Sequence, residues 1–203
     1  MDSNVYRVPE SEVPVAKPSD GVEPQSGPLP FYVVAPRKLL LMYFSTFGLY
    51  HVYWFYKNWT LYARFRGARL WPVGRAIFSI FFTHALFSRV DREARAAGVA
   101  FAWSPRGLAT LYVIFTLASN LLDRLAWKEI GTPYTDFLSF VLLIPIGSVL
   151  YRAQKIVNVA CGNPTGQTNR RLSASNYLWI VLGLLLWLLT LLDLYEIIFG
   201  LPV

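Results

Sequence analysis

The stretch Leu172–Leu192 runs for 21 residues without a charged side chain, and its centre, Leu184–Leu189, contains only leucine and one tryptophan. A helix of that length rises about 1.5 Å per residue and reaches across the roughly 30 Å hydrocarbon core of a bilayer. In water, a helix that is apolar on all sides has no face to expose. The stretch therefore predicts a membrane-spanning helix. The low charged fraction of the chain, 15%, agrees with that reading.

Four further stretches lack Asp, Glu, Lys and Arg: residues 39–56, 76–88, 108–122 and 137–151. Together with Leu172–Leu192 they predict an all-α, polytopic helical membrane protein with about five membrane helices. Residues 76–88 are short for a span, which is typical of an interfacial or re-entrant segment. Snorkelling of the flanking Arg75 and Arg89 can also let this segment cross. The expected number of spans is five if residues 76–88 cross and four if they are re-entrant.

The first 30 residues differ from the rest in composition. They hold six of the 13 prolines, and five acidic residues against two basic ones. Proline at this density blocks helices and sheet ladders, and few apolar groups are present to offset the entropy of ordering. We expect a disordered, Pro-rich acidic tail over 1–30 and a helical membrane domain over 31–203. The tail has no apolar segment of a signal peptide, so the first hydrophobic helix is expected to act as an uncleaved targeting signal.

Two Ser/Thr-Pro pairs mark expected helix starts. Ser104 followed by Pro105 is typical of an N-cap and a first-turn proline, and Thr132 followed by Pro133 repeats the pattern. Each pair directly precedes one of the apolar stretches. The sequence therefore predicts that new helices begin at these two places.

Basic residues in the short loops predict the orientation. Residues 151–175 contain four basic residues and no acidic one, which favours the cytoplasmic side, whereas residues 123–136 mix both signs. We expect a cytoplasmic N-terminus and a periplasmic C-terminus. Residues 57–75 are the exception, because five crossing helices would put this basic loop outside. If residues 76–88 are re-entrant, the loop lies inside and the N-terminus outside.

Counting excludes several kinds of site. Cys161 is the only cysteine, and His51 and His84 are the only histidines. A disulfide within the chain and a metal site built from His and Cys are therefore excluded. The sequence lacks the signatures of serine hydrolases, zinc peptidases, phosphate-binding loops and dinucleotide-binding folds. No cofactor is expected.

Polar side chains within or beside the apolar stretches are candidate membrane sites, because such residues are costly in lipid. The four candidates are His84, Asn120, Asp123 and Asn158. His84 suits either a proton relay or a neutral hydrogen bond to a neighbouring helix. Asp123 suits either a buried site or an interfacial charge.

Aromatic residues concentrate where the first apolar stretch ends, at Tyr50, Tyr53, Trp54, Tyr56 and Trp59. Such rings are typical of the belt that meets lipid headgroups. With His51 nearby, a stacked ligand such as a quinone is the alternative.

The basic residues of the following loop, Arg64, Arg66, Arg69 and Arg75, are candidate contacts to anionic lipid headgroups. The first expected partner is therefore a bilayer with anionic headgroups. Other membrane proteins, or further copies of this chain, are the second. Nucleic acid is not expected, because the aromatic residues are predicted to lie in the bilayer rather than on an exposed stacking platform.

Three segments carry a resemblance to a protein family: Phe31–Val34, Thr46–Tyr50 and Tyr53–Lys57. The last two form a Gly-x-Tyr-x-x-Tyr-Trp-Phe-Tyr-Lys type signature. In these segments the chain resembles small multi-pass inner-membrane proteins of bacteria that have no established activity. The resemblance implies a bacterial inner-membrane location and carries over no functional residue.

Three functional hypotheses follow, in this order. The first is an accessory, assembly or interaction protein of the membrane. The second is a small transporter or channel that acts as an oligomer, which needs polar residues facing one lumen. The third is a lipid-modifying membrane enzyme that uses the basic loop over 57–75.

Overall fold

The computed structural model describes residues 29–98 and 102–200, and over these residues the chain is helical. Except for residues 29 and 30, the tail expected over 1–30 lies outside the described residues. The elements are α1 (Pro36–Ser45), α2 (Tyr50–Arg66), α3 (Pro72–Ile77), α4 (Ser79–Ala96), α5 (Pro105–Trp127), α6 (Tyr134–Ala160), the short 3₁₀ turn η1 (Gln167–Asn169) and α7 (Ala174–Phe199). The predicted all-α class is confirmed.

Among the described residues, three helices are long and apolar enough to cross a membrane. They are α5, α6 and α7, with 23, 27 and 26 residues. They contain the predicted stretches 108–122 and 137–151 and most of 172–192. The other two predicted spans take a different form.

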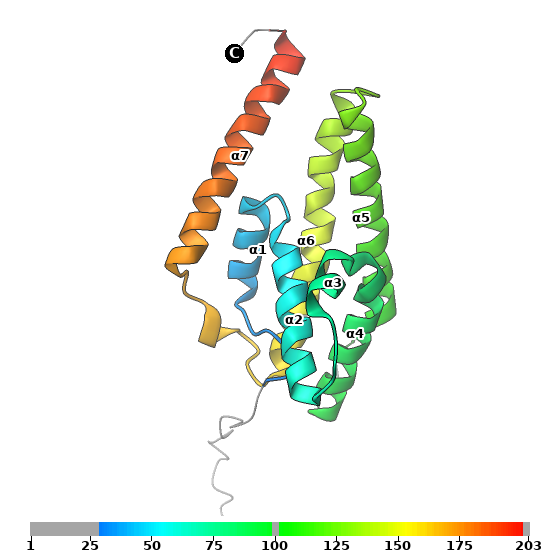
Figure 1. The fold of residues 1–203 in the computed structure, drawn as a ribbon, viewed down its shortest axis with the longest axis vertical. Coiled ribbons are helices and arrows are strands. Elements are labelled where there is room, and N and C mark those ends of the chain that lie inside the picture. The colour runs from blue at the N-terminus through cyan, green and yellow to red at the C-terminus, as the bar shows by residue number, and fades with distance from the viewer. Residues whose placement is uncertain (1–28, 99–101, 201–203) are drawn as a thin grey trace, which may run out of the picture.

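The prediction of one continuous helix over 39–56 is wrong. The chain leaves the helix after Ser45, turns through Phe47 and Gly48 with φ of 51° and 80°, and starts α2 at Tyr50. Glycine adopts such a left-handed conformation without strain, which is why the reversal falls here. The two short helices form a hairpin whose turn lies about halfway along the bundle (Figure 1).

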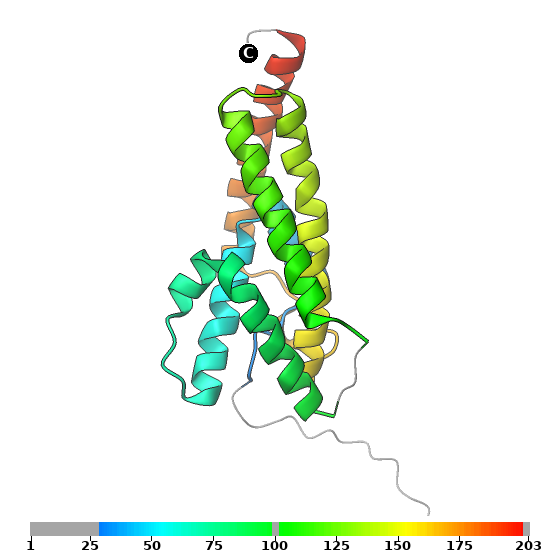
Figure 2. The ribbon, with the colours of Figure 1, turned by 90° about the vertical axis from the view of Figure 1, so that its right-hand side faces the viewer.

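The predicted helix over 76–88 is interrupted as well. α3 ends at Ile77, Phe78 is non-helical, and α4 begins at Ser79 and continues to Ala96. In Figure 2, α3 lies below the middle of the bundle, and α4 descends from it toward the end at which the described chain begins. This region is a second bent unit rather than one straight crossing helix.

The long helices are arranged unequally. α5 and α6 run antiparallel and side by side over their whole length, whereas α7 stands apart and packs mainly on α1 (Figures 1 and 2). Gly183 is the only buried residue of α7. The body of the protein therefore contacts this most apolar helix over a small area.

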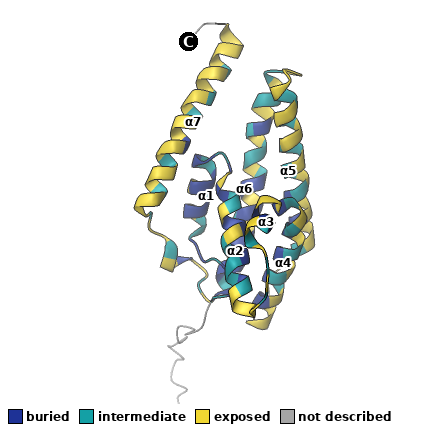
Figure 3. Cartoon of the chain, in the orientation of Figure 1, coloured by how far each residue is buried: buried dark blue, intermediate teal, exposed yellow. Residues whose placement is uncertain are grey.

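The core lies where the hairpin meets α6. Figure 3 shows the buried residues concentrated in α1, α2 and the adjoining half of α6, with α7 exposed along almost all of its length. Fully buried aromatic rings fill this region, Trp54 and Trp59 among them. Beyond the hairpin turn, α5 and α6 continue as a pair with much less covering.

The helix starts follow the sequence signals closely. Ser104 caps α5, and its hydroxyl accepts from the N–H of Gly107 at 3.1 Å, as predicted. α6 begins one residue later than the Thr132–Pro133 pair suggests, with Pro133 at the cap. Ser173 and Asn176 form a reciprocal capping box at the start of α7.

Candidate functional site

The tip of the α1–α2 hairpin is seated between the midpoints of α6 and α7. A Cβ on Gly147, midway along α6, would lie 3.0 Å from the Tyr43 ring. A Cβ on Gly183 of α7 would lie 1.7 Å from the carbonyl oxygen of Ser45. The indole of Trp187 donates to the Phe44 carbonyl at 2.8 Å. Two glycines and one tryptophan thus fix the depth to which the hairpin reaches.

The backbone groups at this turn find partners within the chain. The Thr46 hydroxyl donates to the Met42 carbonyl at 2.7 Å and accepts from the N–H of Tyr50 at 3.1 Å. His51 Nδ1 donates to the Gly48 carbonyl at 2.7 Å. Buried backbone polar groups need such partners wherever water is excluded. The turn is therefore suited to an apolar environment.

A cavity of about 320 Å³ lies beside the hairpin tip. α5 lines it with residues one turn apart on one face, and α2 and α6 add His51 and Ser139. We name four of the α5 residues the polar stripe: Thr116, Ser119, Asn120 and Asp123. The structure thus brings two predicted candidates, Asn120 and Asp123, together at one cavity.

The polar stripe is only partly covered. Asn120 and Asp123 are exposed. The hydroxyl of Thr116 is buried and lies near the Tyr112 hydroxyl, one turn earlier on α5. This face of α5 therefore offers donors and acceptors that the described chain leaves unused.

Asn158, the fourth candidate, lies elsewhere and holds the segment 31–35, which has no regular secondary structure. The N–H of Val34 donates to Asn158 Oδ1 at 3.3 Å, and Asn158 Nδ2 donates to the Val34 carbonyl at 2.9 Å. Gln154, one turn earlier, donates from Nε2 to the Tyr32 carbonyl at 3.0 Å. The side-chain amides act here as a neighbouring strand would.

Two more amides complete this network, which we call the amide clamp: Asn58, Gln154, Asn158 and Asn169. Asn58 Oδ1 accepts from the N–H of Tyr32 at 3.1 Å, and Asn169 Nδ2 donates to the Val33 carbonyl at 3.0 Å. Lys38 Nζ in turn donates to Asn169 Oδ1 at 2.8 Å. The clamp ties the segment before α1 to α2, α6 and η1, so its role is to position the hairpin.

The expected aromatic belt divides into two groups. Tyr50, Trp54 and Trp59 are buried against other helices, whereas Tyr53 and Tyr56 are exposed. Trp54 donates from Nε1 to Gln154 Oε1 at 2.5 Å, which joins it to the amide clamp. The buried rings differ from the expectation of a belt because α2 doubles back into the bundle and turns that face inward.

The arginines expected to contact headgroups have different surroundings. Arg64, Arg66 and Arg69 are exposed, and Arg66 forms an ion pair with the buried Glu93. Arg75 is partly buried against aromatic rings. The four therefore do not form one patch.

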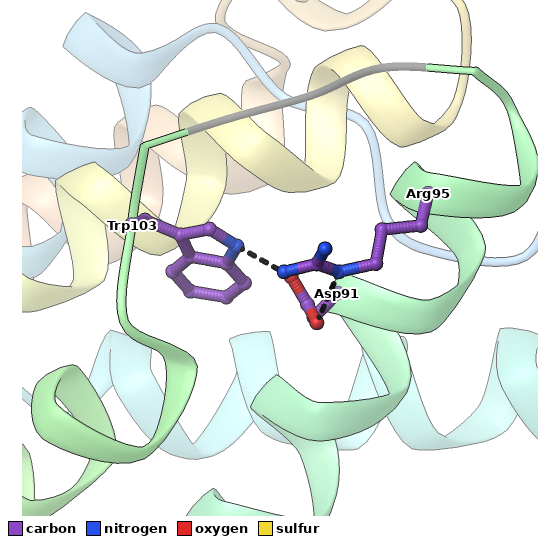
Figure 4. A network of polar contacts seen from close by, with 3 residues as sticks. All are labelled: Asp91, Arg95 and Trp103. Atoms are coloured by element: carbon purple, nitrogen blue, oxygen red, sulfur yellow. Dashed lines mark hydrogen bonds and ion pairs between the residues drawn. The ribbon is translucent and has the colours of Figure 1, made fainter.

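Near the end of α4, Asp91 accepts two hydrogen bonds. Arg95 Nε donates to one carboxylate oxygen at 2.8 Å and Trp103 Nε1 donates to the other at 2.9 Å (Figure 4). The Arg95 hydrogen bond lowers the pKa of Asp91; partial burial opposes this, and the Trp103 hydrogen bond lowers the pKa further. This network holds Trp103, just before the start of α5, against α4.

His84 is exposed, and its Nε2 lies 3.1 Å from the Thr110 hydroxyl, away from the cavity. The four polar candidates thus occupy three separate places. Sequence reasoning missed Gln154, although its spacing of four from Asn158 within an apolar helix was a usable signal. It also missed His51 as a cavity residue.

Among the residues that the structure describes, no group of three or more His, Cys, Asp or Glu side chains is arranged to hold a metal ion. Comparison with protein-family models, curated proteins and solved structures finds no match for this chain.

Proposed function

We propose that this chain is a multi-pass protein of a bacterial inner membrane that spans the bilayer with α5, α6 and α7 and works in association with another membrane protein. In this arrangement the α1–α2 hairpin enters the bilayer from one side and turns near the midplane. The seating of its tip at the middle of α6 and α7 supports this depth. The inner-membrane assignment also draws on the resemblance described above.

The distribution of charge supports a cytoplasmic N-terminus and a periplasmic C-terminus. With the hairpin turned back, one end of the bundle, which we call the basic end, holds the start of α1 and the α2–α3, α4–α5 and α6–α7 connections (Figure 1). Its segments include Arg37, Lys38, Arg64, Arg66, Arg69, Arg92, Arg95, Arg106, Arg152, Lys155, Arg170 and Arg171, against Asp91 and Glu93. The opposite end has Arg124 and Lys128 against Asp123, Glu129, Asp136, Asp193 and Glu196. Basic ends face the cytoplasm.

This arrangement also brings the basic loop over residues 57–75 into agreement with the orientation rule. Under five spans, residues 57–75 lie outside, although they carry five basic residues. A hairpin that returns puts them at the basic end with residues 89–106 and 151–175. Three spans and two bent units therefore satisfy the orientation rule throughout.

The observation that carries the association with a partner is the polar stripe on α5. Asn120 is exposed on a helix that is long and apolar enough to span, with Thr116 one turn deeper on the same face and Asp123 one turn nearer the charged end. Hydrocarbon cannot satisfy the side-chain amide of Asn120, whereas a second membrane helix with hydrogen-bonding side chains can. We therefore assign this face to a membrane helix of another protein.

Site-specific photocrosslinking tests the assignment. A benzoylphenylalanine at position 120 is expected to give a discrete protein adduct in cells. The same probe at Leu121, which lies about 100° further around α5 and outside the cavity lining, is expected to give no protein adduct. Co-purification of the adduct partner should fall in N120L/D123L. Absence of a position-dependent adduct contradicts the proposal.

Topology is tested separately with single cysteines in a C161A background. A cysteine at position 64 is expected to be protected from a membrane-impermeant reagent added to the periplasm, and one at position 130 is expected to be labelled. Labelling at position 64 from the periplasm would restore five spans and contradict the three-span arrangement.

A second function, a small transporter or channel acting as an oligomer, is favoured by the cavity of about 320 Å³. Its lining of His51, Ser139 and the polar stripe suits a small polar solute. An adduct at position 120 of twice the mass of the chain, together with proteoliposome flux that D123N abolishes, would support this alternative over the first.

A further inference from the structure

Two arginines from different helices contact the same tryptophan ring. The Arg75 guanidinium carbon lies 4.5 Å from the centroid of Trp59, and that of Arg89 lies 5.2 Å from it. Arg75 also contacts Phe82 at 4.8 Å, and Arg89 contacts Tyr62 at 5.4 Å. The aromatic rings of α2 and α4 thus place two like charges over one tryptophan ring, and the charge of Arg89 is near enough to lower the pKa of Arg75.

Neither guanidinium has a carboxylate partner among the described residues. The ion pairs found there join Arg66 to Glu93 and Arg95 to Asp91. Arg89 donates to the carbonyl of Ala85 at 2.9 Å, which leaves its charge uncompensated. Two partly buried cations that share a ring repel each other, and a bound anion removes that repulsion.

The electrostatics and the hydrogen bonding of this cluster both indicate that it lacks acceptors. Burial lowers the pKa of Arg75, and the nearby charge of Arg89 lowers it further. The Trp59 side chain is fully buried, and its Nε1–H has no acceptor among the described residues. The cluster therefore has an excess of donors and of positive charge over acceptors.

The depth of the cluster agrees with the height of lipid phosphates. The hairpin turn lies at the midpoints of α6 and α7, and Trp59 lies nine residues below the start of α2 at Tyr50. At about 1.5 Å per residue, this displacement is close to half of the ~30 Å hydrocarbon thickness. Trp59 and the two arginines then lie at the boundary with the headgroups on the side of the basic end.

We propose that Arg75 and Arg89, positioned on Trp59, form a binding site for one phosphate group. Two guanidinium forks can bind phosphate oxygens bidentately, which lysine cannot do. Either a phospholipid headgroup or inorganic phosphate can supply the group. Only the lipid source rests on the proposed membrane location; the inorganic source does not.

Native mass spectrometry of the detergent-purified full chain tests the site. The probes are dioctanoyl phosphatidylglycerol and dioctanoylglycerol, which lacks the phosphate. The wild type is expected to retain one phosphatidylglycerol in preference, by about fivefold for each arginine. R75Q/R89Q is expected to lose this preference. R64Q/R69Q, which removes the same charge from exposed positions, is expected to keep it.

The source of the phosphate is decided by competition. Displacement of the lipid by millimolar inorganic phosphate identifies a site for the free ion, and retention of the lipid identifies a headgroup site. Equal wild-type binding of both lipids, without displacement or binding of inorganic phosphate, overturns the proposal. Equal loss in R64Q/R69Q and R75Q/R89Q overturns it too, because binding would then follow net charge.

Folding of the variants is controlled through R75K/R89K, which keeps both charges and is expected to bind with intermediate preference. Should R75Q/R89Q fail to fold, the wild-type comparison and this lysine variant decide the question. Full wild-type affinity in R75K/R89K contradicts the bidentate geometry.

Discussion

Asn158 on α6 forms two hydrogen bonds to the backbone of Val34, 124 residues earlier in the chain, one through each atom of its amide. Both residues are fully buried. This pair closes the chain on itself, because it joins the segment before α1 to the last turns of α6. The α1–α2 hairpin is therefore held at both its entrance and its tip.

Replacement of Asn158 by leucine is expected to destabilise the protein strongly. The change leaves the N–H and carbonyl of Val34 buried without partners, at about 1–3 kcal/mol for each group. Thermal loss of the helical circular dichroism signal in detergent measures the effect. Asn163→Ala, which removes hydrogen bonds exposed to water, serves as control. Similar melting of the two variants would show that the clamp contributes little.

Replacement of Gly183 by leucine is expected to separate α7 from α1. A Cβ at this position would meet the carbonyl oxygen of Ser45, so the helices must move apart. Overpacking of this kind costs about 1–3 kcal/mol, or about 2–4 °C in the melting midpoint per kcal/mol. Leu184→Phe adds bulk at an exposed position of α7 and is expected to leave the midpoint unchanged. An equal shift in both variants contradicts this account.

The contribution of Asp91 to stability is expected to depend on pH. Its pKa is lowered in the folded chain, chiefly by the Arg95 hydrogen bond. The stabilisation is therefore complete above the unfolded value of about 3.9 and is lost as pH falls through the lower folded pKa. The difference in melting midpoint between wild type and Asp91→Asn should be constant from pH 7 to 5 and shrink below pH 4. A difference that grows on acidification has the wrong sign.

Cys161 is expected to react slowly with alkylating reagents in the folded chain. Burial raises the pKa of its thiol to about 11. At pH 8 the thiolate fraction is then about 0.001, compared with about a quarter for an ordinary thiol. Alkylation should rise about tenfold per pH unit between 8 and 10 and jump on unfolding. Fast reaction at pH 8 in native protein would contradict this burial.

The long spans could be predicted from the sequence because their signal is local. An uncharged run such as Leu172–Leu192 has no stable place in water, whatever its neighbours are. The start of α5 at Ser104–Pro105 was equally readable, because capping depends on a few adjacent residues. These features need no knowledge of the tertiary structure.

The hairpin could not be predicted in this way. Residues 39–56 are apolar throughout, and the turn relies on Phe47 and Gly48 adopting positive φ. A lone glycine in an apolar run is also common in straight membrane helices. What selects the turn is the fit of its tip against Gly147 and Gly183, far along the chain.

Only part of the candidate site could be predicted, because some of its residues meet through contacts that are distant in the chain. Asn120 and Asp123 were visible as polar residues at the end of an apolar run, but His51 joins them only after the hairpin folds back. The buried aromatic rings of α2 were expected at the headgroups, because composition does not tell which side of a helix meets protein. Long-range contacts decide these points.

The hairpin precedes in the chain both helices that cradle its tip. During translation its turn leaves the ribosome long before α6 and α7 have been synthesised. In the proposed membrane arrangement, the insertion machinery must therefore keep this segment at the bilayer surface, or shield it, until α6 and α7 have been synthesised. Biogenesis ends with the oldest hydrophobic segment docking onto the youngest, so truncated nascent chains that stop before α7 should be substrates for membrane quality-control proteases.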